Sequence, residues 1–395
     1  MPIAAKARQA MQSQSWIRQM FELGIQLRAQ YGAENVFDLS LGNPVLEPPE
    51  AFRRELRRLA DDPSLGTHRY MPNAGYMETR QAVADRLKRD LAMPFTGEHV
   101  VMTVGAGGAL NVVLKALLDP GDEVLALAPY FPEYVGYADN HGGVARIVLS
   151  GETFQPDVEA LERAVTPRTK ALILNSPNNP SGAVYSDDAL RGVARVLARA
   201  EERHGHPVYL VSDEPYAGLV YDGLRLPRPL RHHPASIIVT SYSKDLSLAG
   251  ERIGYLAVRP DCPDAGELVN ACIWANRVLG FVNAPALMQR VVRALQDARV
   301  DVAWYQRQRD KLYNGLRGMG YSLHKPQGAF YAFPRSPVLD DVAFVKELLE
   351  ERVIVTPGVG FGAPGYFRIS YSVEERVLDG ALEGFAKVAK KHGLG

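Results

Sequence analysis

The chain has 395 residues, about two and a half times the usual ~150-residue domain, so it has room for one large domain and a smaller one. Apolar residues make up 46% of it and charged residues 23%, which excludes disordered and low-complexity classes. The 45 basic residues balance the 45 acidic residues, so no net charge favours binding to nucleic acid or to an anionic membrane.

Cysteine usage and the start of the chain bear on its location. Cys262 and Cys272 form no CxxC or His/Cys pattern, so we expect reduced thiols, no disulfide framework and no metal site. The first 14 residues lack the apolar stretch of a secretory signal, and no window approaches the ~18 to 20 apolar residues of a spanning helix. We therefore expect a cytoplasmic protein without a membrane partner.

Residues 1–50 contain a predicted helix at 15–31 and a strand at 36–41, with too few apolar residues for a core of their own. We expect this N-terminal arm to pack on the smaller domain or on a partner subunit.

Residues 51–284 are predicted to form the large domain. Between about 98 and 260, short runs of Val, Ile and Leu alternate with amphipathic stretches such as 108–118 and 187–204, the second of which starts after Ser186 as N-cap. This pattern predicts an α/β fold whose mostly parallel seven-stranded sheet is flanked by helices. The expected strands are 100–103, 123–127, 144–148, 171–175, 208–212, 236–240 and 254–258.

The pattern changes in residues 285–395. A long helix at 286–317 is followed by short strands at 328–333, 353–355 and 366–371 and by a final helix at 374–391. We expect a smaller α+β domain there.

The segment after the strand at 236–240 is Ser241-Tyr242-Ser243-Lys244, and Arg252 follows eight residues later. Residues just beyond the carboxyl end of a parallel strand face the ligand crevice of such folds. Hydroxyl, amine and guanidinium groups together could hold a phosphate while the lysine forms an imine with an aldehyde. For a single lysine, a solvated loop position is the commoner explanation.

Asp213 and Tyr216 follow the strand at 208–212. A carboxylate that emerges from an apolar strand needs a cation or a hydrogen-bond donor, and a protonated pyridine nitrogen would satisfy Asp213. Tyr216 could donate a phenol to the same ring. Taken singly, Asp213 could instead be a helix N-cap and Tyr216 a core aromatic.

Two further strand ends carry candidate ligand groups. Asn179 lies in a proline-rich tight turn that would fix its amide for a hydrogen bond to a ring oxygen, although turn chemistry alone explains the motif equally well. The glycine-rich residues 105–108 precede a helix, so Ala106 and Gly107 could offer backbone N–H groups to a phosphate. Leu110 stands where a dinucleotide-binding GxGxxG needs its last glycine, which argues against that motif. Phe131 could stack on a ring or be a core aromatic.

Arg368 lies in an apolar strand near the end of the chain. Its planar guanidinium could bind a substrate carboxylate through two parallel hydrogen bonds. The alternative explanation is an ion pair with a structural role.

Taken together, these motifs resemble the class I/II aminotransferases, the fold type I pyridoxal phosphate enzymes, over essentially the whole chain, and aspartate aminotransferases in particular. The resemblance implies pyridoxal 5'-phosphate as cofactor. It implies that Lys244 forms the Schiff base, that Asp213 pairs with the pyridine nitrogen, that Asn179 and Tyr216 bond the ring hydroxyl and that Phe131 stacks on the ring.

The same resemblance assigns the phosphate to Ser241, Arg252 and the amides of Ala106 and Gly107. It assigns the substrate α-carboxylate to Arg368 and places Asn179 at the substrate as well. Lys244 would then act as general base in a ping-pong transfer of an amino group from an L-amino acid to a 2-oxo acid, with aspartate and 2-oxoglutarate the favoured pair.

The resemblance also implies a homodimer with shared active sites, in which Tyr70 reaches the phosphate of the neighbouring subunit and Gly42 closes over the substrate. Arg277 lies near the place where aspartate-specific members carry an arginine for the second carboxylate, offset by one residue. Two alternatives stay open: a carbon-sulfur lyase or β-decarboxylase on the same scaffold, and a non-catalytic pyridoxal phosphate-binding regulator, which would need a DNA-binding domain ahead of the fold.

Overall fold

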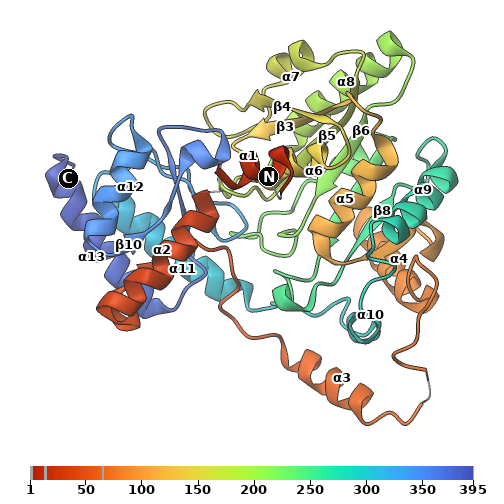
Figure 1. Cartoon of the computed structure of the whole chain (residues 1–395), viewed down its shortest axis with the longest axis horizontal. Coiled ribbons are helices and arrows are strands. Elements are labelled where there is room, and N and C mark those ends of the chain that lie inside the picture. Colours follow the sequence, from red (N-terminus) through yellow and green to blue (C-terminus); the bar gives the residue numbers. More distant parts are fainter. Residues whose placement is uncertain (1–2, 13–15, 65, 395) are drawn as a thin grey trace.

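The structure is a computed structural model that describes residues 3–12, 16–64 and 66–394. Figure 1 shows the central sheet with its helices on one side of the molecule and the C-terminal helices on the other. The helices are α1 (Ala5–Gln12), α2 (Trp16–Tyr31), α3 (Glu50–Ala60), α4 (Met77–Leu91), α5 (Gly105–Leu117), α6 (Glu133–Asp139), α7 (Val158–Ala164), α8 (Asp187–His204), α9 (Ala265–Val278), α10 (Ala286–Arg293), α11 (Val302–Gly318), α12 (Asp341–Glu350) and α13 (Glu375–Lys391).

The central sheet has seven strands in the order β2-β8-β7-β6-β5-β3-β4. All neighbouring pairs are parallel except those of β8, which is antiparallel to both β2 and β7. The seven strands predicted from the sequence are all present, with ends shifted by one or two residues at most. They are β2 (Val100–Thr103), β3 (Glu123–Ala128), β4 (Val144–Leu149), β5 (Thr169–Asn175), β6 (Tyr209–Asp213), β7 (Ser236–Ser241) and β8 (Gly254–Val258).

Helices cover both faces of the inner strands of this sheet, which explains why those strands are continuous apolar runs, whereas the edge strand β4 is largely exposed. Successive residues of a strand point to opposite faces. In β5, Ile173 packs in the cluster that contains α5 and α9, whereas Leu172 and Leu174 pack in the cluster that contains α8. Ser186 caps α8 as predicted, accepting a hydrogen bond from the Ala189 N–H.

A separate hydrophobic cluster joins the N-terminal arm to the C-terminal part of the chain. It contains Met20 of α2 and Leu39 together with buried residues of α11, α12 and α13. The short strands are β1 (Phe37–Asp38), β9 (Tyr331–Ala332), β10 (Val353–Ile354), β11 (Thr356–Pro357) and β12 (Phe367–Ser370). Because β1 pairs in parallel with β10, the N-terminal arm packs on the C-terminal part, one of the two partners expected for it. Residue 15, where the first helix was expected to start, lies outside the described residues.

The long helix predicted at 286–317 is wrong. Two helices, α10 and α11, occupy this range, and the Asp301 side chain caps α11 by accepting from the Trp304 N–H at 3.0 Å. The buried side chains of α10 pack in one cluster with those of α4 and β2, whereas α11 packs with the C-terminal helices. The strands predicted at 36–41, 328–333, 353–355 and 366–371 are present but shorter.

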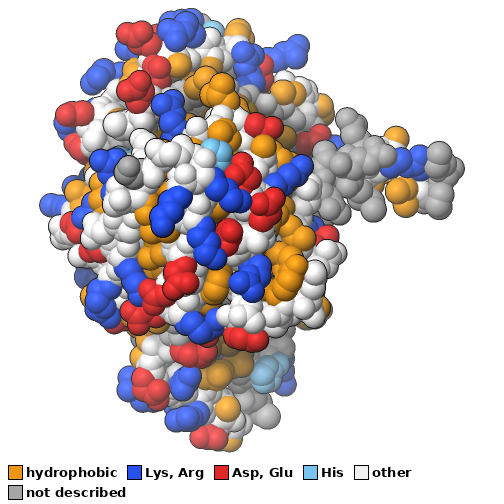
Figure 2. All heavy atoms as spheres, turned by 90° about the vertical axis from the view of Figure 1, so that its left-hand side faces the viewer, with side chains coloured by type: hydrophobic (Ala, Val, Ile, Leu, Met, Phe, Trp, Pro, Cys, Tyr) orange, Lys and Arg blue, Asp and Glu red, His pale blue; other side chains and the backbone are white. Residues whose placement is uncertain are grey.

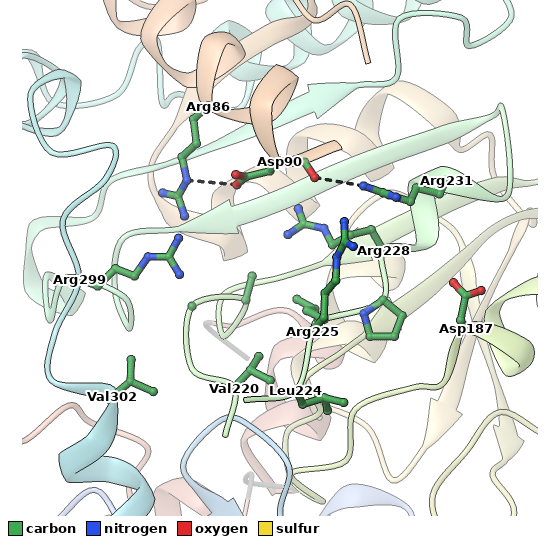
Figure 3. A pocket seen from close by; sticks show the side chains of 14 residues that line it. Arg86, Asp90, Asp187, Val220, Leu224, Arg225, Arg228, Arg231, Arg299 and Val302 are labelled. Carbon is green, nitrogen blue, oxygen red and sulfur yellow. Dashed lines mark hydrogen bonds and ion pairs between the residues drawn. The ribbon is translucent and has the colours of Figure 1, made fainter. Parts of the chain in front are cut away.

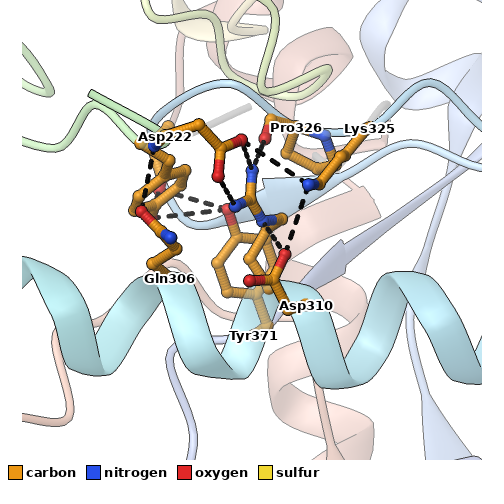
Figure 4. A network of polar contacts seen from close by, with 9 residues as sticks. Asp222, Gln306, Asp310, Lys325, Pro326 and Tyr371 are labelled. Atoms are coloured by element: carbon orange, nitrogen blue, oxygen red, sulfur yellow. Dashed lines mark hydrogen bonds and ion pairs between the residues drawn. The ribbon is translucent and has the colours of Figure 1, made fainter. Parts of the chain in front are cut away.

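Helix α11 is tied to the loop that follows β6 by a buried guanidinium. Arg309 donates to Asp222 Oδ1 at 2.8 Å and to the Pro326 carbonyl at 2.7 Å, and its Nε lies 2.8 Å from Asp310 Oδ1. Figure 4 shows this network above α11. It fixes the loop around residue 222 against the helix.

The surface that carries α12 and α13 has acidic and basic side chains intermixed (Figure 2), as expected for a chain with balanced charge. Within the described ranges, no helix combines the length and apolar character needed to cross a membrane.

Candidate active site

The carboxyl ends of β5, β6 and β7 meet at one cavity of about 310 Å³. It also reaches the start of α5 and strand β12 from the C-terminal part of the chain. Residues as distant in the sequence as Gly42 and Arg368 are thereby brought to one place. The residues singled out from the sequence that line the cavity are Gly42, Ala106, Gly107, Phe131, Asn179, Asp213, Tyr216, Ser241, Lys244, Arg252 and Arg368.

Lys244 lies just beyond the end of β7, and its ammonium group donates to the Gly42 carbonyl at 2.7 Å. Removal from water disfavours the charged form, and the positive charges of Arg368 and Arg252 add to this effect, so the pKa of Lys244 falls to about 8. An amine with this pKa is partly unprotonated near neutral pH and can act as nucleophile or base.

Asp213 is the last residue of β6 and is buried. The Tyr134 hydroxyl donates to its Oδ2 at 2.5 Å, whereas Oδ1 is buried without a partner. Burial raises the pKa of Asp213 to about 7, and the hydrogen bond from Tyr134 opposes this rise. A buried carboxylate oxygen without a partner is costly and fits a protonated ring nitrogen.

Tyr134 is a site residue that the sequence reasoning missed. It lies in α6, three residues after Phe131, and the two rings meet edge to face with centroids 5.6 Å apart. Nothing in the sequence distinguishes its hydroxyl from that of a core tyrosine.

Asn179 and Tyr216 connect the cavity to the C-terminal part of the chain. The Asn179 N–H donates to the Asn175 side chain at 2.7 Å, and Asn175 in turn donates to the Asp213 carbonyl at 2.9 Å, so the turn is fixed to β6. The hydroxyls of Tyr216 and Tyr331 lie 3.0 Å apart. Tyr331, in β9, is a second residue that the sequence reasoning missed.

The part of the cavity at α5 suits an anion. The glycine-rich residues 105–108 form the first turn of α5, not a loop before it, so the predicted helix start at 108 is wrong. The first turn of a helix leaves its N–H groups free, and Ala106 and Gly107 line the cavity there. Gly105 has φ +79°, and a Cβ on it would lie 3.0 Å from Arg252 Nη2. Ser241 and Arg252 line the same cavity.

Arg368 is 1% exposed, within β12. It donates to Asn179 Oδ1 at 3.1 Å and to the Ser40 carbonyl, while its Nε is buried without a partner. Among the described residues, no carboxylate lies within 4.0 Å of its guanidinium, so the structural ion pair considered above is absent. Burial lowers the pKa of Arg368, because its charge is poorly solvated.

Tyr70 and Arg277 do not line this cavity. Tyr70 is 89% exposed, and Arg277 is exposed in the last turn of α9. Both were expected to act on a neighbouring subunit, so their roles stay predictions. Glu133, next to Tyr134, was also missed by the sequence reasoning and, unlike Tyr134, lines the cavity; burial raises its pKa, and its Oε2 has no partner.

The residues of the cavity fit pyridoxal phosphate. The free N–H groups of α5 with Ser241 and Arg252 suit a phosphate, the orphaned oxygen of Asp213 suits a pyridinium nitrogen, and the amine of Lys244 lies in the same cavity.

Comparisons with known proteins agree with this interpretation. A family model for aminotransferases of class I and II matches residues 34–385. The aspartate/prephenate aminotransferase of Thermus thermophilus is 38% identical over 361 residues, which cover 89% of this chain and 90% of that protein. The structure of an aminotransferase from Eubacterium rectale matches with a TM-score of 0.96 at 37% identity over 99% of both chains. That of T. thermophilus aspartate aminotransferase with maleate matches with a TM-score of 0.86 at 34% identity over 98% of this chain and 100% of the other. The chain therefore belongs to the class I and II aminotransferases, with the fold type I architecture expected for it.

Proposed function

We propose that this pyridoxal phosphate-dependent aminotransferase uses L-aspartate and 2-oxoglutarate as its preferred pair and that the residues of the cavity have the roles set out below. The family and the named relatives establish amino-group transfer between small amino and 2-oxo acids, and they do not favour the lyase or decarboxylase alternative. The observation that supports the roles is the convergence of Lys244, Asp213 and Arg368 on one cavity, with buried atoms of the last two left unpaired.

The cofactor would be held at three points. Lys244 would bond its aldehyde, Asp213 would pair with its ring nitrogen, and Arg252 with Ser241 and the N–H groups of α5 would bind its phosphate. Asn179 and Tyr216 would donate to the ring hydroxyl, and Phe131 would stack on the ring. Bound pyridoxal phosphate supplies a carbonyl that takes up the amino group and a ring that accepts the electron pair released at the substrate α-carbon.

Lys244 has the properties of the group that moves the proton. With its pKa lowered to about 8, the Nζ atom could take a proton from the substrate α-carbon and deliver it to the cofactor carbon that carried the aldehyde, on the other side of the amino nitrogen. The hydrogen bond to the Gly42 carbonyl holds Nζ in the cavity when it is not covalently bound. Tyr134 keeps Asp213 oriented and favours its ionised form.

Arg368 would bind the substrate α-carboxylate. Its guanidinium is already held by Asn179 and the Ser40 carbonyl, so little conformational entropy is lost when a carboxylate binds. The rings of Tyr331 and Phe361, whose centroids each lie 4.8 Å from the guanidinium carbon, help to hold it in place.

The second carboxylate of aspartate needs a cation of its own, which we assign to a second subunit. Among the residues that line the cavity, the cations are Lys244, Arg252 and Arg368, and each already has a role. An additional cation would therefore come from Arg277 of a partner subunit, and Tyr70 would reach the phosphate in the same way. We propose a homodimer with shared active sites.

Two experiments test these roles. Borohydride reduction of the holoenzyme followed by peptide mapping should label Lys244; label elsewhere would refute the cavity assignment. A panel of donors with 2-oxoglutarate should show the highest kcat/KM for L-aspartate, falling at least about tenfold in Arg277→Ala but not for L-alanine. Equal loss for both donors would refute the role of Arg277.

The dimer can be tested by complementation. Tyr70→Ala and Lys244→Ala should each be nearly inactive alone. Co-refolded hybrids should regain activity, because one of their two sites then combines Lys244 of one chain with Tyr70 of the other. No recovery in hybrids isolated by differential tags would show that each site is complete within one chain.

A further inference from the structure

A second, larger cavity of about 730 Å³ lies between α4, the loop that follows β6 and the start of α11. Five arginines line it: Arg86, Arg225, Arg228, Arg231 and Arg299. We call this space the arginine cavity. Figure 3 shows Arg86 and Arg299 on one side of it and Arg225 and Arg228 on the other. Its remaining wall is largely apolar, formed by Val220, Leu224, Leu226, Pro227 and Val302.

The arginines are only partly neutralised. Arg86 lies 3.6 Å from Asp90, and Arg228 lies 2.7 Å from Glu214. The other three form no ion pair within 4.0 Å among the residues that the structure describes. Asp187, the second acidic residue of the wall, already binds His232 at 2.8 Å and Arg191 outside the cavity. The Nε of Arg228 is buried without a hydrogen-bond partner.

The arginine cavity borders the active site through two carboxylates. Glu214, which pairs with Arg228, directly follows Asp213, and Asp245 directly follows Lys244. Asp245 accepts a hydrogen bond from the Gly218 N–H at 3.3 Å. The positive charges of Arg86, Arg299 and Arg228 also act on its carboxylate. An anion that attracts these arginines would therefore act on the residues next to the proposed cofactor contacts.

Guanidinium groups on opposite walls with a free N–H fork suit phosphate oxygens, because they bind them in pairs and stay charged at every relevant pH. The volume is within the range of sites for small organic ligands, and the apolar wall would accept a ring or an aliphatic body. A dicarboxylate substrate would leave that wall uncovered. From this geometry we propose that the arginine cavity binds a small organic diphosphate, such as a nucleoside diphosphate, as a ligand distinct from the substrates and the cofactor.

The binding test uses the holoenzyme with excess pyridoxal phosphate removed by dialysis, so that the cofactor phosphate site stays filled. Isothermal titration with ADP should give one site per chain. Arg225→Ala and Arg299→Ala should each weaken it at least about tenfold, because a hydrogen bond to a charged group is lost. Both side chains are exposed, so alanine leaves the fold intact. Arg163→Ala, which removes a 70% exposed arginine of α7, is the matched control and should change nothing.

Pyrophosphate and adenosine separate the two parts of the ligand. Pyrophosphate should bind more weakly than ADP, and adenosine should not bind detectably. Pyrophosphate binding as tightly as ADP would overturn recognition of the organic body and leave an inorganic anion site. Absence of ADP binding, or binding that Arg225→Ala and Arg299→Ala leave unchanged, would overturn the proposal.

A separate measurement tests whether the arginine cavity acts on the active site. ADP should shift the pH at which the absorbance of the bound cofactor changes, in the wild-type protein and in Arg163→Ala but not in Arg225→Ala. ADP binding without such a shift would overturn the link through Glu214 and Asp245. Since binding is measured without substrate, the result is independent of which amino acid the enzyme uses.

Discussion

Replacing Asp213 by asparagine should stabilise the cofactor-free protein while it inactivates the enzyme. Burial raises the pKa of Asp213 from its ordinary 3.8 to about 7. The unfolded chain releases this proton at lower pH than the folded chain, so folding becomes less favourable as pH rises from about 4 to 7. About three pH units at ~1.36 kcal/mol each give a cost of about 4 kcal/mol above pH 7, and about 2 kcal/mol at pH 5. Asparagine keeps the size of the side chain and the acceptor for Tyr134 but never ionises.

Urea denaturation of the apo forms at pH 5 and pH 8 measures this effect. The gain in unfolding free energy for Asp213→Asn should grow from about 2 to about 4 kcal/mol between the two pH values. Asp119→Asn, at an exposed carboxylate, should give no gain at either pH. The apo forms are compared because a bound pyridinium would itself neutralise the charge of Asp213. A gain that is equal at both pH values would refute burial of an ionisable group as its cause.

Three further substitutions probe the cavity. Tyr134→Phe removes the hydrogen bond that lowers the pKa of Asp213, so the acid limb of kcat/KM against pH should move up by about one unit; an unchanged limb would contradict this role. Arg368→Lys keeps a charge but loses the planar fork, so KM for the amino acid should rise about 10- to 100-fold in steady-state assays, and an unaltered KM would exclude the carboxylate contact. In Gly42→Ala, the new Cβ would overlap the Tyr331 hydroxyl, so kcat/KM should fall at least about tenfold with little change in Tm; full activity would show that this tyrosine can move freely.

Much of the site could be predicted because its residues follow recognisable strands. Lys244, Asp213 and Asn179 each come at or soon after the end of a buried apolar run, and parallel strands bring their carboxyl ends to one edge of the sheet. Tyr134 and Tyr331 could not be predicted in the same way. A buried tyrosine in a helix or a two-residue strand has the same local pattern whether its hydroxyl faces a cavity or the core.

The errors in secondary structure have local causes that a periodic pattern does not reveal. Apolar residues continue at helical spacing through 286–317, but the Asp301 side chain starts a new helix by capping the Trp304 N–H. The glycine-rich residues 105–108 read as a loop because glycine disfavours helix, yet the close approach of Gly105 to Arg252 suits a glycine at the start of α5. The arginine cavity could not be predicted, because only three of its five arginines lie together, within residues 225–231, whereas Arg86 and Arg299 come from distant segments.

The separation of Asp213 from Arg368 is the feature that makes the cavity a binding site. A buried carboxylate and a buried guanidinium would stabilise each other if they paired, but neither is among the charges that shift the pKa of the other. Arg368 bonds the Asn179 side chain instead, and Asp213 bonds Tyr134. Each charged group therefore keeps an unsatisfied atom, at a cost in folding stability. Under the proposed roles, that cost would be recovered when a cation binds Asp213 and a carboxylate binds Arg368, the pair of partners that a pyridinium ring carrying an amino acid would present.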